Sequence, residues 1–172
     1  LGRHCDQGWM RKRASLWLAP QPGALVPPII AVWNHPCIRT LLHLARNCID
    51  HGIEPAAERV TAGKPETGMI ELKAYQKGGN VLIEMRDDGR GLNHDRIFAK
   101  AVERGLVSAD ARLTPEQIAE LIFVPGFSTS ETVNDVSGRG VGMDVVRNNI
   151  QALGGSVEIA SQPGKGTCFT LR

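Results

Sequence analysis

Long apolar runs, a strong charge of either sign and closely paired cysteines are all missing from this 172-residue chain. The longest apolar candidate, at 23–33, is interrupted by Pro27 and Pro28, whereas a membrane-spanning helix needs about 20 apolar residues. The net charge is only +2, with acidic and basic residues interspersed, so neither nucleic acid nor an anionic membrane is expected as a partner. Repeats and low-complexity tails are also absent, and the length predicts one domain with its own core.

Cysteine is sparse and poorly spaced for metal or redox chemistry. Cys5, Cys37, Cys48 and Cys168 include no Cys-x-x-Cys pair, which argues against a zinc knuckle or a redox dithiol. Two of them lie among apolar residues, where a free cysteine behaves as a small hydrophobic side chain. This usage fits a reducing compartment, and we expect a cytoplasmic location.

Three glycines stand out among the features that are present. Gly138, Gly140 and Gly142 alternate directly before a segment with helical apolar spacing, in which Met143, Val146, Ile150 and Leu153 form one stripe. Alternating glycines let successive backbone N–H groups turn toward one point. The following helix adds the positive end of its dipole and its unpaired amides. This combination predicts a loop that binds polyphosphate.

The loop matches neither of two familiar phosphate motifs. No Lys-Ser or Lys-Thr follows a glycine at the offset of a P-loop. Met143 stands where a dinucleotide fingerprint after Gly138 and Gly140 needs its third glycine, and His94 stands there after Gly89 and Gly91. A lone Gly-x-Gly-x-Gly run is also typical of an ordinary loop that caps a helix. The interpretation therefore depends on the rest of the chain.

Three other segments support a nucleotide site. NVLIEMRDDGRGL (80–92) predicts an alternating strand that ends in two carboxylates and a Gly-x-Gly turn. PCIRTLLHLARNCIDHGIE (36–54) predicts a helix on which His43, Asn47 and His51 recur every four residues. Such a polar stripe needs polar partners, because burial without them is costly. PGKGTCFTL (163–171) predicts a turn into a final strand.

Taken in chain order and together with FVPGFSTSE, these segments resemble the N, G1, F and G2 boxes of the ATP-binding domain shared by histidine kinases, gyrase, Hsp90 and MutL. Within that superfamily the chain is most similar to CheA chemotaxis kinases, through HLARNCIDHGIE, DDGRGL, FVPGFSTSE, VSGRGVGMDVV, LGGSVEI and GKGTCFTL. The resemblance runs from about residue 36 to the end. It implies an ATP-binding kinase catalytic domain over 36–172, preceded by a divergent strand and helix of the same domain over 1–35.

The expected fold is α+β, a two-layer sandwich with helices on one face of a mixed β-sheet. Hairpin strands with interspersed helices favour it, and the resemblance implies the Bergerat-type ATP-binding version with a lid. We expect strands at about 12–19, 155–160 and 166–171, and a hairpin from MIELKAYQ and NVLIEMR turned at 77–80. We expect helices at about 24–34, 37–51, after Pro55, 93–104, 115–121 and 142–153, with the lid within 93–137.

The resemblance implies roles for the N-box residues. Asn47 matches the Mg²⁺-binding asparagine, and its amide oxygen is a hard ligand of the kind that Mg²⁺ prefers. His51 matches a CheA-family histidine near metal and phosphates, although a histidine beside Gly52 at a helix end is also typical of a C-terminal cap. His43 holds the position where hydrolytic relatives carry a glutamate base, and an imidazole there spares ATP for transfer. A buried histidine with a satisfied hydrogen bond is the alternative for His43. Arg46 could reach phosphate or be solvated.

At the adenine end, Asp87 matches the carboxylate that accepts a hydrogen bond from the adenine N6 amine. Asp88 is the alternative, because neighbouring strand residues point to opposite sides. Gly89 and Gly91 would let the backbone pass close to the base, and Thr167 matches a threonine that reaches the same end.

Phosphate binding is expected from the glycine loop and the lid. The expected contacts are Gly138, Arg139, Gly140, Val141, Gly142 and Met143 in the loop, with Ser128, Thr129 and also Ser130 at the lid edge. Lys100 and Arg104 correspond to cationic family positions, although a solvated helix face explains them equally. Phe123, Pro125 and Phe127 resemble the F box, or are ordinary core residues.

The implied function is to bind Mg·ATP and donate its γ-phosphoryl to a histidine on a separate phosphoacceptor domain in two-component, chemotaxis-like signalling. This chain contains no phosphoacceptor box, so we expect a catalytic domain of a longer kinase with dimerisation and receptor-coupling domains. A nucleotide-responsive interaction module is the second hypothesis. A gyrase-like ATP hydrolase is the third, and His43 in place of glutamate argues against it.

Overall fold

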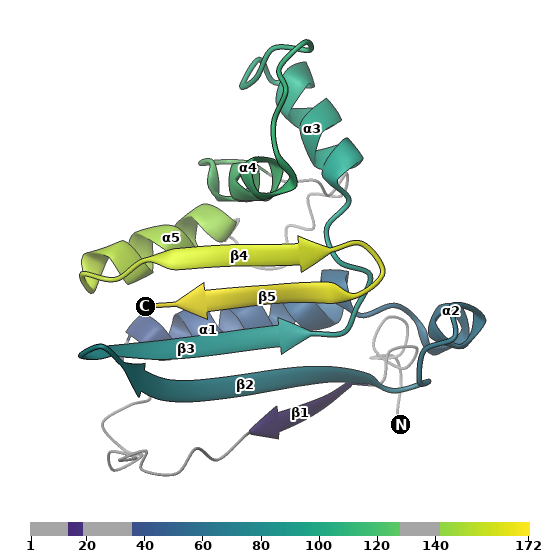
Figure 1. The fold of residues 1–172 in the computed structure, drawn as a ribbon, viewed down its shortest axis with the longest axis vertical. Coiled ribbons are helices and arrows are strands. Elements are labelled where there is room, and N and C mark those ends of the chain that lie inside the picture. The colour runs from purple at the N-terminus through teal and green to yellow at the C-terminus, as the bar shows by residue number, and fades with distance from the viewer. Residues whose placement is uncertain (1–13, 19–35, 128–141) are drawn as a thin grey trace, which may run out of the picture.

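The computed structural model describes residues 14–18, 36–127 and 142–172. The predicted helix at about 24–34 lies outside them; the other predicted elements within them are present, with small shifts of their ends (Figure 1). The elements are β1 (Ala14–Leu18), α1 (Pro36–Asn47), the π-helical turn η3 (Cys48–Gly52), α2 (Ala56–Thr61), β2 (Gly68–Lys77), β3 (Asn80–Asp87), α3 (His94–Glu103), α4 (Pro115–Glu120), the 3-10 turn η4 (Leu121–Phe123), α5 (Met143–Ala152), β4 (Val157–Gln162) and β5 (Gly166–Leu171).

One mixed sheet organises the domain. Its strand order is β1-β2-β3-β5-β4. β1 runs parallel to β2, and the other neighbours are antiparallel. Helices α1 and α5 pack against each other behind the sheet, and α4 lies beside the β4 edge (Figure 1). The predicted α+β fold with helices on one face of a mixed sheet is confirmed.

The hairpin between β2 and β3 follows from its turn residues. Lys77 pairs with Asn80, which leaves Gly78 and Gly79 as a two-residue turn. Both glycines have positive φ, 59° and 82°, the conformation that a tight hairpin turn requires and that glycine adopts without strain. This register fixes which β3 residues face the helices, and it places Asp87 at the end of the strand opposite Ile70.

The main core lies between the sheet and the helical layer. Its buried members alternate along the strands and recur at helical spacing: Leu44, Cys48, Ile70, Met85, Ala119, Phe123, Val146, Ile150, Val157, Ile159, Phe169 and Leu171. The prediction for Leu153 is wrong, because α5 ends at Ala152 and the Leu153 side chain is 45% exposed. Among the described residues, no helix is long and apolar enough to cross a membrane.

Candidate functional site

A cavity of about 510 Å³ lies where the C-terminal end of α1, the end of β3 and the start of α5 meet. Of the predicted site residues, it brings together Asn47, His51, Asp87, Gly91, Phe127, Gly142, Met143 and Thr167. A second hollow of about 520 Å³ by the β4–β5 turn shares Thr167 but contains neither Asn47 nor Asp87. We therefore take the first cavity as the candidate site.

The helix that carries Asn47 changes its winding at the cavity wall. The Ile53 N–H donates to the Cys48 carbonyl, five residues back, at 2.7 Å. Such π-helical turns occur frequently at functional sites. This one brings Gly52 against Asp87, where an added Cβ would lie 3.2 Å from the carboxylate. Asn47, just before this turn, and His51, within it, both line the cavity.

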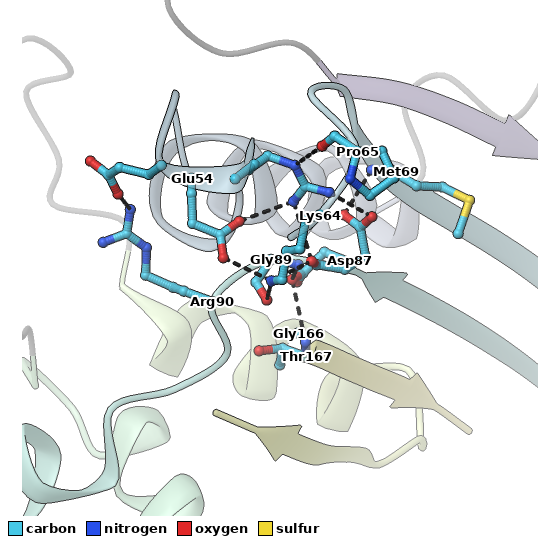
Figure 2. A network of polar contacts seen from close by, with 12 residues as sticks. Glu54, Lys64, Pro65, Met69, Asp87, Gly89, Arg90, Gly166 and Thr167 are labelled. Atoms are coloured by element: carbon cyan, nitrogen blue, oxygen red, sulfur yellow. Dashed lines mark hydrogen bonds and ion pairs between the residues drawn. The ribbon is translucent and has the colours of Figure 1, made fainter. Parts of the chain in front are cut away.

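The two carboxylate oxygens of Asp87 differ in their hydrogen bonding. Oδ1 accepts hydrogen bonds from the N–H groups of Gly89 at 2.9 Å and Thr167 at 3.3 Å (Figure 2). Oδ2 is buried without a hydrogen-bond partner. Because leaving a buried acceptor unpaired is unfavourable, Oδ2 is suited to accept an N–H from a molecule in the cavity.

Burial is the main influence on the ionisation of Asp87. It raises the pKa of the carboxyl above the ordinary aspartate value, and the negative charge of Asp88 adds to this. The N–H groups of Gly89 and Thr167 and the nearby Cys48 thiol oppose the rise by stabilising the ionised form. Burial and the nearby Asp87 charge also raise the pKa of Cys48, so its side chain stays a thiol.

Asp88 faces away from the cavity. Its Oδ2 accepts from Arg59 Nη2 at 2.8 Å, and its Oδ1 accepts from the Met69 N–H at 2.8 Å. Of the two aspartates left open by the sequence, Asp87 is therefore the one that lines the site. The two aspartates face opposite sides because successive side chains of an extended chain point in opposite directions.

Gly89 has a packing role that the sequence did not indicate. It does not line the cavity; a Cβ there would lie 2.2 Å from the Gly52 carbonyl oxygen. Across the site, Gly166 has φ +101°, and a Cβ there would lie 2.0 Å from the Asp87 carbonyl oxygen. These close contacts hold the end of β3 between η3 and β5.

Asn47 is oriented by two contacts through its amide nitrogen. Nδ2 donates to Met143 Sδ at 3.1 Å and lies 3.1 Å from His43 Nε2. Burial, followed by the Arg46 charge, lowers the pKa of His43, which favours the neutral ring that can accept this bond. Among the described residues, Asn47 Oδ1 has no hydrogen-bond partner. His43 itself does not line the cavity.

The cationic residues at the cavity differ from those expected. Lys100 pairs with Glu103 at 2.8 Å, and Arg104 donates to the Gly126 carbonyl and lies over the Phe127 ring. Neither lines the cavity, whereas Arg90 and Arg96 do. Sequence reasoning missed these two arginines, although both lie within six residues of Gly91, beside the G1 box.

The three F-box residues lie in three different environments, and part of the phosphate loop is not described. Phe127 lines the cavity, Phe123 is buried in the core, and Pro125 is exposed. Gly142 and Met143 line the cavity at the start of α5. The predicted contacts Ser128, Thr129, Ser130, Gly138, Arg139, Gly140 and Val141 lie outside the described residues.

A buried charge network beside the site was also missed. Arg59 is 0% exposed and pairs with Glu54 at 3.0 Å and Asp88 at 2.8 Å. Lys64 pairs with Glu54 at 2.8 Å, and both are labelled in Figure 2. No sequence period connects these residues. The charged residues in the short segment 55–67, between the N box and β2, could have indicated such a network.

Comparisons with known proteins identify the family of this sequence. The sequence model of the histidine kinase-, DNA gyrase B- and HSP90-like ATPase family matches residues 36–172. The chain is 55% identical over 131 residues to the chemotaxis protein CheA of Cereibacter sphaeroides, covering 76% of this chain and 19% of that protein. It is 56% identical over 134 residues to CheA of Klebsiella aerogenes, covering 78% of this chain and 20% of that protein. It therefore spans about a fifth of these relatives.

Among solved structures, the ATP-binding domain of PrrB from Mycobacterium tuberculosis is similar at 15% identity with a TM-score of 0.46, covering 94% of this chain and 79% of that one. This likeness is too low to support a functional assignment, which rests on the sequence matches. The chain belongs to the histidine kinase-, DNA gyrase B- and HSP90-like ATPase family, and within it the sequence is of the CheA type.

Proposed function

We propose that this chain binds Mg·ATP in the 510 Å³ cavity and donates the γ-phosphoryl to a histidine on a separate phosphoacceptor domain, in two-component signalling of the chemotaxis kind. The observation that carries the proposal is the buried, unpartnered Oδ2 of Asp87 in a cavity that also contains Asn47. The phosphoacceptor would belong to a longer cytoplasmic kinase that also contains dimerisation and receptor-coupling domains.

Adenine suits the open acceptor. Its 6-amino group can donate a hydrogen bond to Asp87 Oδ2, whereas guanine has a carbonyl oxygen, which is also an acceptor, at the same position. A charged acceptor facing that oxygen would be left unpaired, so ATP should be preferred over GTP. Thr167 lies beside Asp87 through its backbone N–H, which supports its expected place at the same end of the nucleotide.

The phosphate end is expected near Asn47 and the two arginines. Asn47 Oδ1 is a hard oxygen ligand, and bound Mg²⁺ would neutralise phosphate charge. His51 also lines the cavity and is the second residue proposed near the metal. Arg90 and Arg96 supply positive charge at the cavity wall. Phosphoryl transfer needs mainly such positioning and charge neutralisation from the protein.

The position of His43 favours transfer over hydrolysis. A hydrolase of this superfamily would need a base there that faces the bound water. His43 instead contacts Asn47 and does not line the cavity, so it helps to orient the proposed Mg²⁺ ligand. An interaction module without catalysis would share the binding site, and only a transfer assay separates it from a kinase.

The test is a calorimetric titration of the chain with ATP, with and without Mg²⁺, followed by incubation of the chain, γ-labelled ATP and an isolated CheA-type phosphoacceptor domain. Saturable binding that Mg²⁺ strengthens, and label on the acceptor histidine, are expected. Binding without label would favour the interaction module. Steady phosphate release without labelled acceptor would favour the hydrolase.

Binding should weaken at acidic pH through Asp87. The ligand amine needs the ionised carboxylate, so protonation of Asp87 competes with binding. Because burial raises the pKa of Asp87, the ADP affinity should fall, by up to tenfold per pH unit, starting at a higher pH than an ordinary aspartate would give. The difference between the chain and Asp87→Asn in calorimetry, from pH 7.5 to 4.5, isolates this effect from protonation of ADP. Parallel pH profiles would contradict it.

A further inference from the structure

We infer that Lys64 and Arg59 are positioning residues for base selection, and that they act on Asp87 through one peptide group, the one joining Asp88 to Gly89. The inference rests on the proposed binding of adenine nucleotide. Neither residue lines the nucleotide cavity, so any effect on the ligand must pass through the backbone that they hold.

The peptide group is bound at both ends. Its carbonyl, that of Asp88, accepts from Lys64 Nζ at 2.9 Å and from Arg59 Nη1 at 3.3 Å. Its N–H, that of Gly89, donates to Asp87 Oδ1 at 2.9 Å. Hydrogen bonds connected in this way polarise one another, because a cation on the carbonyl makes the N–H of the same peptide a stronger donor. The cations therefore strengthen the bond that holds Asp87 Oδ1.

Holding Oδ1 decides where Oδ2 points. With Oδ1 bound to two backbone N–H groups, the carboxylate cannot rotate without breaking them, and Oδ2 remains the open acceptor. If the peptide tilts, Oδ1 loses one of its donors and either oxygen can meet the ligand. The selectivity for a 6-amino group then falls even though the cavity persists.

The cations are themselves fixed in place. Lys64 Nζ also donates to the Gly89 carbonyl at 2.7 Å, so it bridges two successive carbonyl oxygens of the turn (Figure 2). Arg59 is anchored by the Pro65 carbonyl at 2.8 Å and by Asp88 Oδ2 at 2.8 Å. Glu54 pairs with both cations. This arrangement leaves little freedom in the direction of the Asp88–Gly89 peptide.

The experiment compares ATP with purine riboside triphosphate, which is ATP without its 6-amino group. For the unmodified chain we expect ATP to bind about 10- to 100-fold more tightly, the range for a hydrogen bond to a charged group. Lys64→Met should lower this ratio to below about one third of its original value. The affinity for purine riboside triphosphate, which makes no bond to Oδ2, should change much less. A loss of folded protein alone would lower both affinities and leave their ratio unchanged.

Lys73→Met is the matched control, because Lys73 also forms an ion pair, with Glu71 at 2.7 Å, and this partner lies outside the 87–91 turn. It should keep the original ratio. Lys64 is the main test because its side chain is 18% exposed while that of Arg59 is 0% exposed, so Arg59→Met is the greater risk to folding. An unchanged ratio in Lys64→Met contradicts this inference alone. Absence of ATP binding by the unmodified chain contradicts the proposed function, and this inference falls with it.

Discussion

Asn47→Ala should remove the part of ATP affinity that depends on Mg²⁺, and with it phosphoryl transfer. Asn47 Oδ1 is a hard oxygen for which the described residues supply no hydrogen-bond donor, while His43 and Met143 contact the amide nitrogen of the same side chain. Removing even an outer-shell partner of a metal costs about 10- to 100-fold, so a direct ligand should cost at least that. Calorimetry with ATP in the presence of Mg²⁺, and the transfer assay, measure both effects.

The control for Asn47 separates metal binding from damage to the pocket. In excess chelator, Asn47→Ala and the unmodified chain should bind ATP equally, since adenine recognition at Asp87 is intact. Asn148→Ala, at an exposed position on α5, should change neither measurement. If Asn47→Ala keeps the full gain in affinity from Mg²⁺, the metal site has been assigned to the wrong residue.

Arg59→Met should destabilise the fold by about 3–5 kcal/mol, the usual cost of removing one partner from a buried charge pair. Arg59 is fully buried and makes four hydrogen bonds, to Glu54, Pro65 and Asp88. Methionine fills much of the volume but leaves carboxylate and carbonyl oxygens short of donors. Urea unfolding at pH 7 measures the loss.

Urea unfolding is measured at pH 7 because of the ionisation of Glu54. Burial by itself would raise the pKa of Glu54, but hydrogen bonds from Lys64 and Arg59 outweigh it and hold the pKa below the ordinary glutamate value. A lowered folded pKa means that this carboxylate contributes stability above the ordinary value and loses it as pH falls through the lowered one. At pH 7 its contribution is fully present.

Arg172→Met is the comparison for Arg59. Arg172 pairs with Glu158 at 3.7 Å, and both side chains are at least half exposed. An exposed pair of this kind contributes at most about 1 kcal/mol, so the loss should be small. A loss below about 1 kcal/mol for Arg59→Met would show that the network is not a source of stability, whatever it does for Asp87.

The element order and the fold class could be predicted from sequence because they depend on local patterns. The alternation of apolar and polar residues over 80–87 predicted the strand that ends at Asp87, and the Gly78–Gly79 pair predicted the hairpin turn. Failures occurred where a side chain's environment depends on distant segments. Leu153 fits the apolar stripe of α5 but is exposed once the helix ends, and the winding at Cys48–Gly52 departs from the α-helical period.

The site shows the same division. Asn47, Asp87 and Thr167 were named from motifs, and the structure brings them to one cavity. Lys100 and Arg104 were chosen by spacing on one helix, yet tertiary contacts direct them to Glu103 and the Gly126 carbonyl. The cationic residues that line the cavity could not be predicted from the sequence. They depend on the direction of α3 relative to the 87–91 turn that precedes it.

Local patterns in the sequence identified the chain as an α+β member of this ATPase family and predicted that an aspartate at the end of β3 lines the candidate site. Short-range patterns and motif residues suffice for that. Only the tertiary structure decided between Asp87 and Asp88, and only it connected Lys64 and Arg59 to the Asp88–Gly89 peptide. The contacts of Arg59 and Lys64 with Asp88 join residues 29 and 24 positions apart, and their geometry is set by packing between elements, which no local period in the chain records.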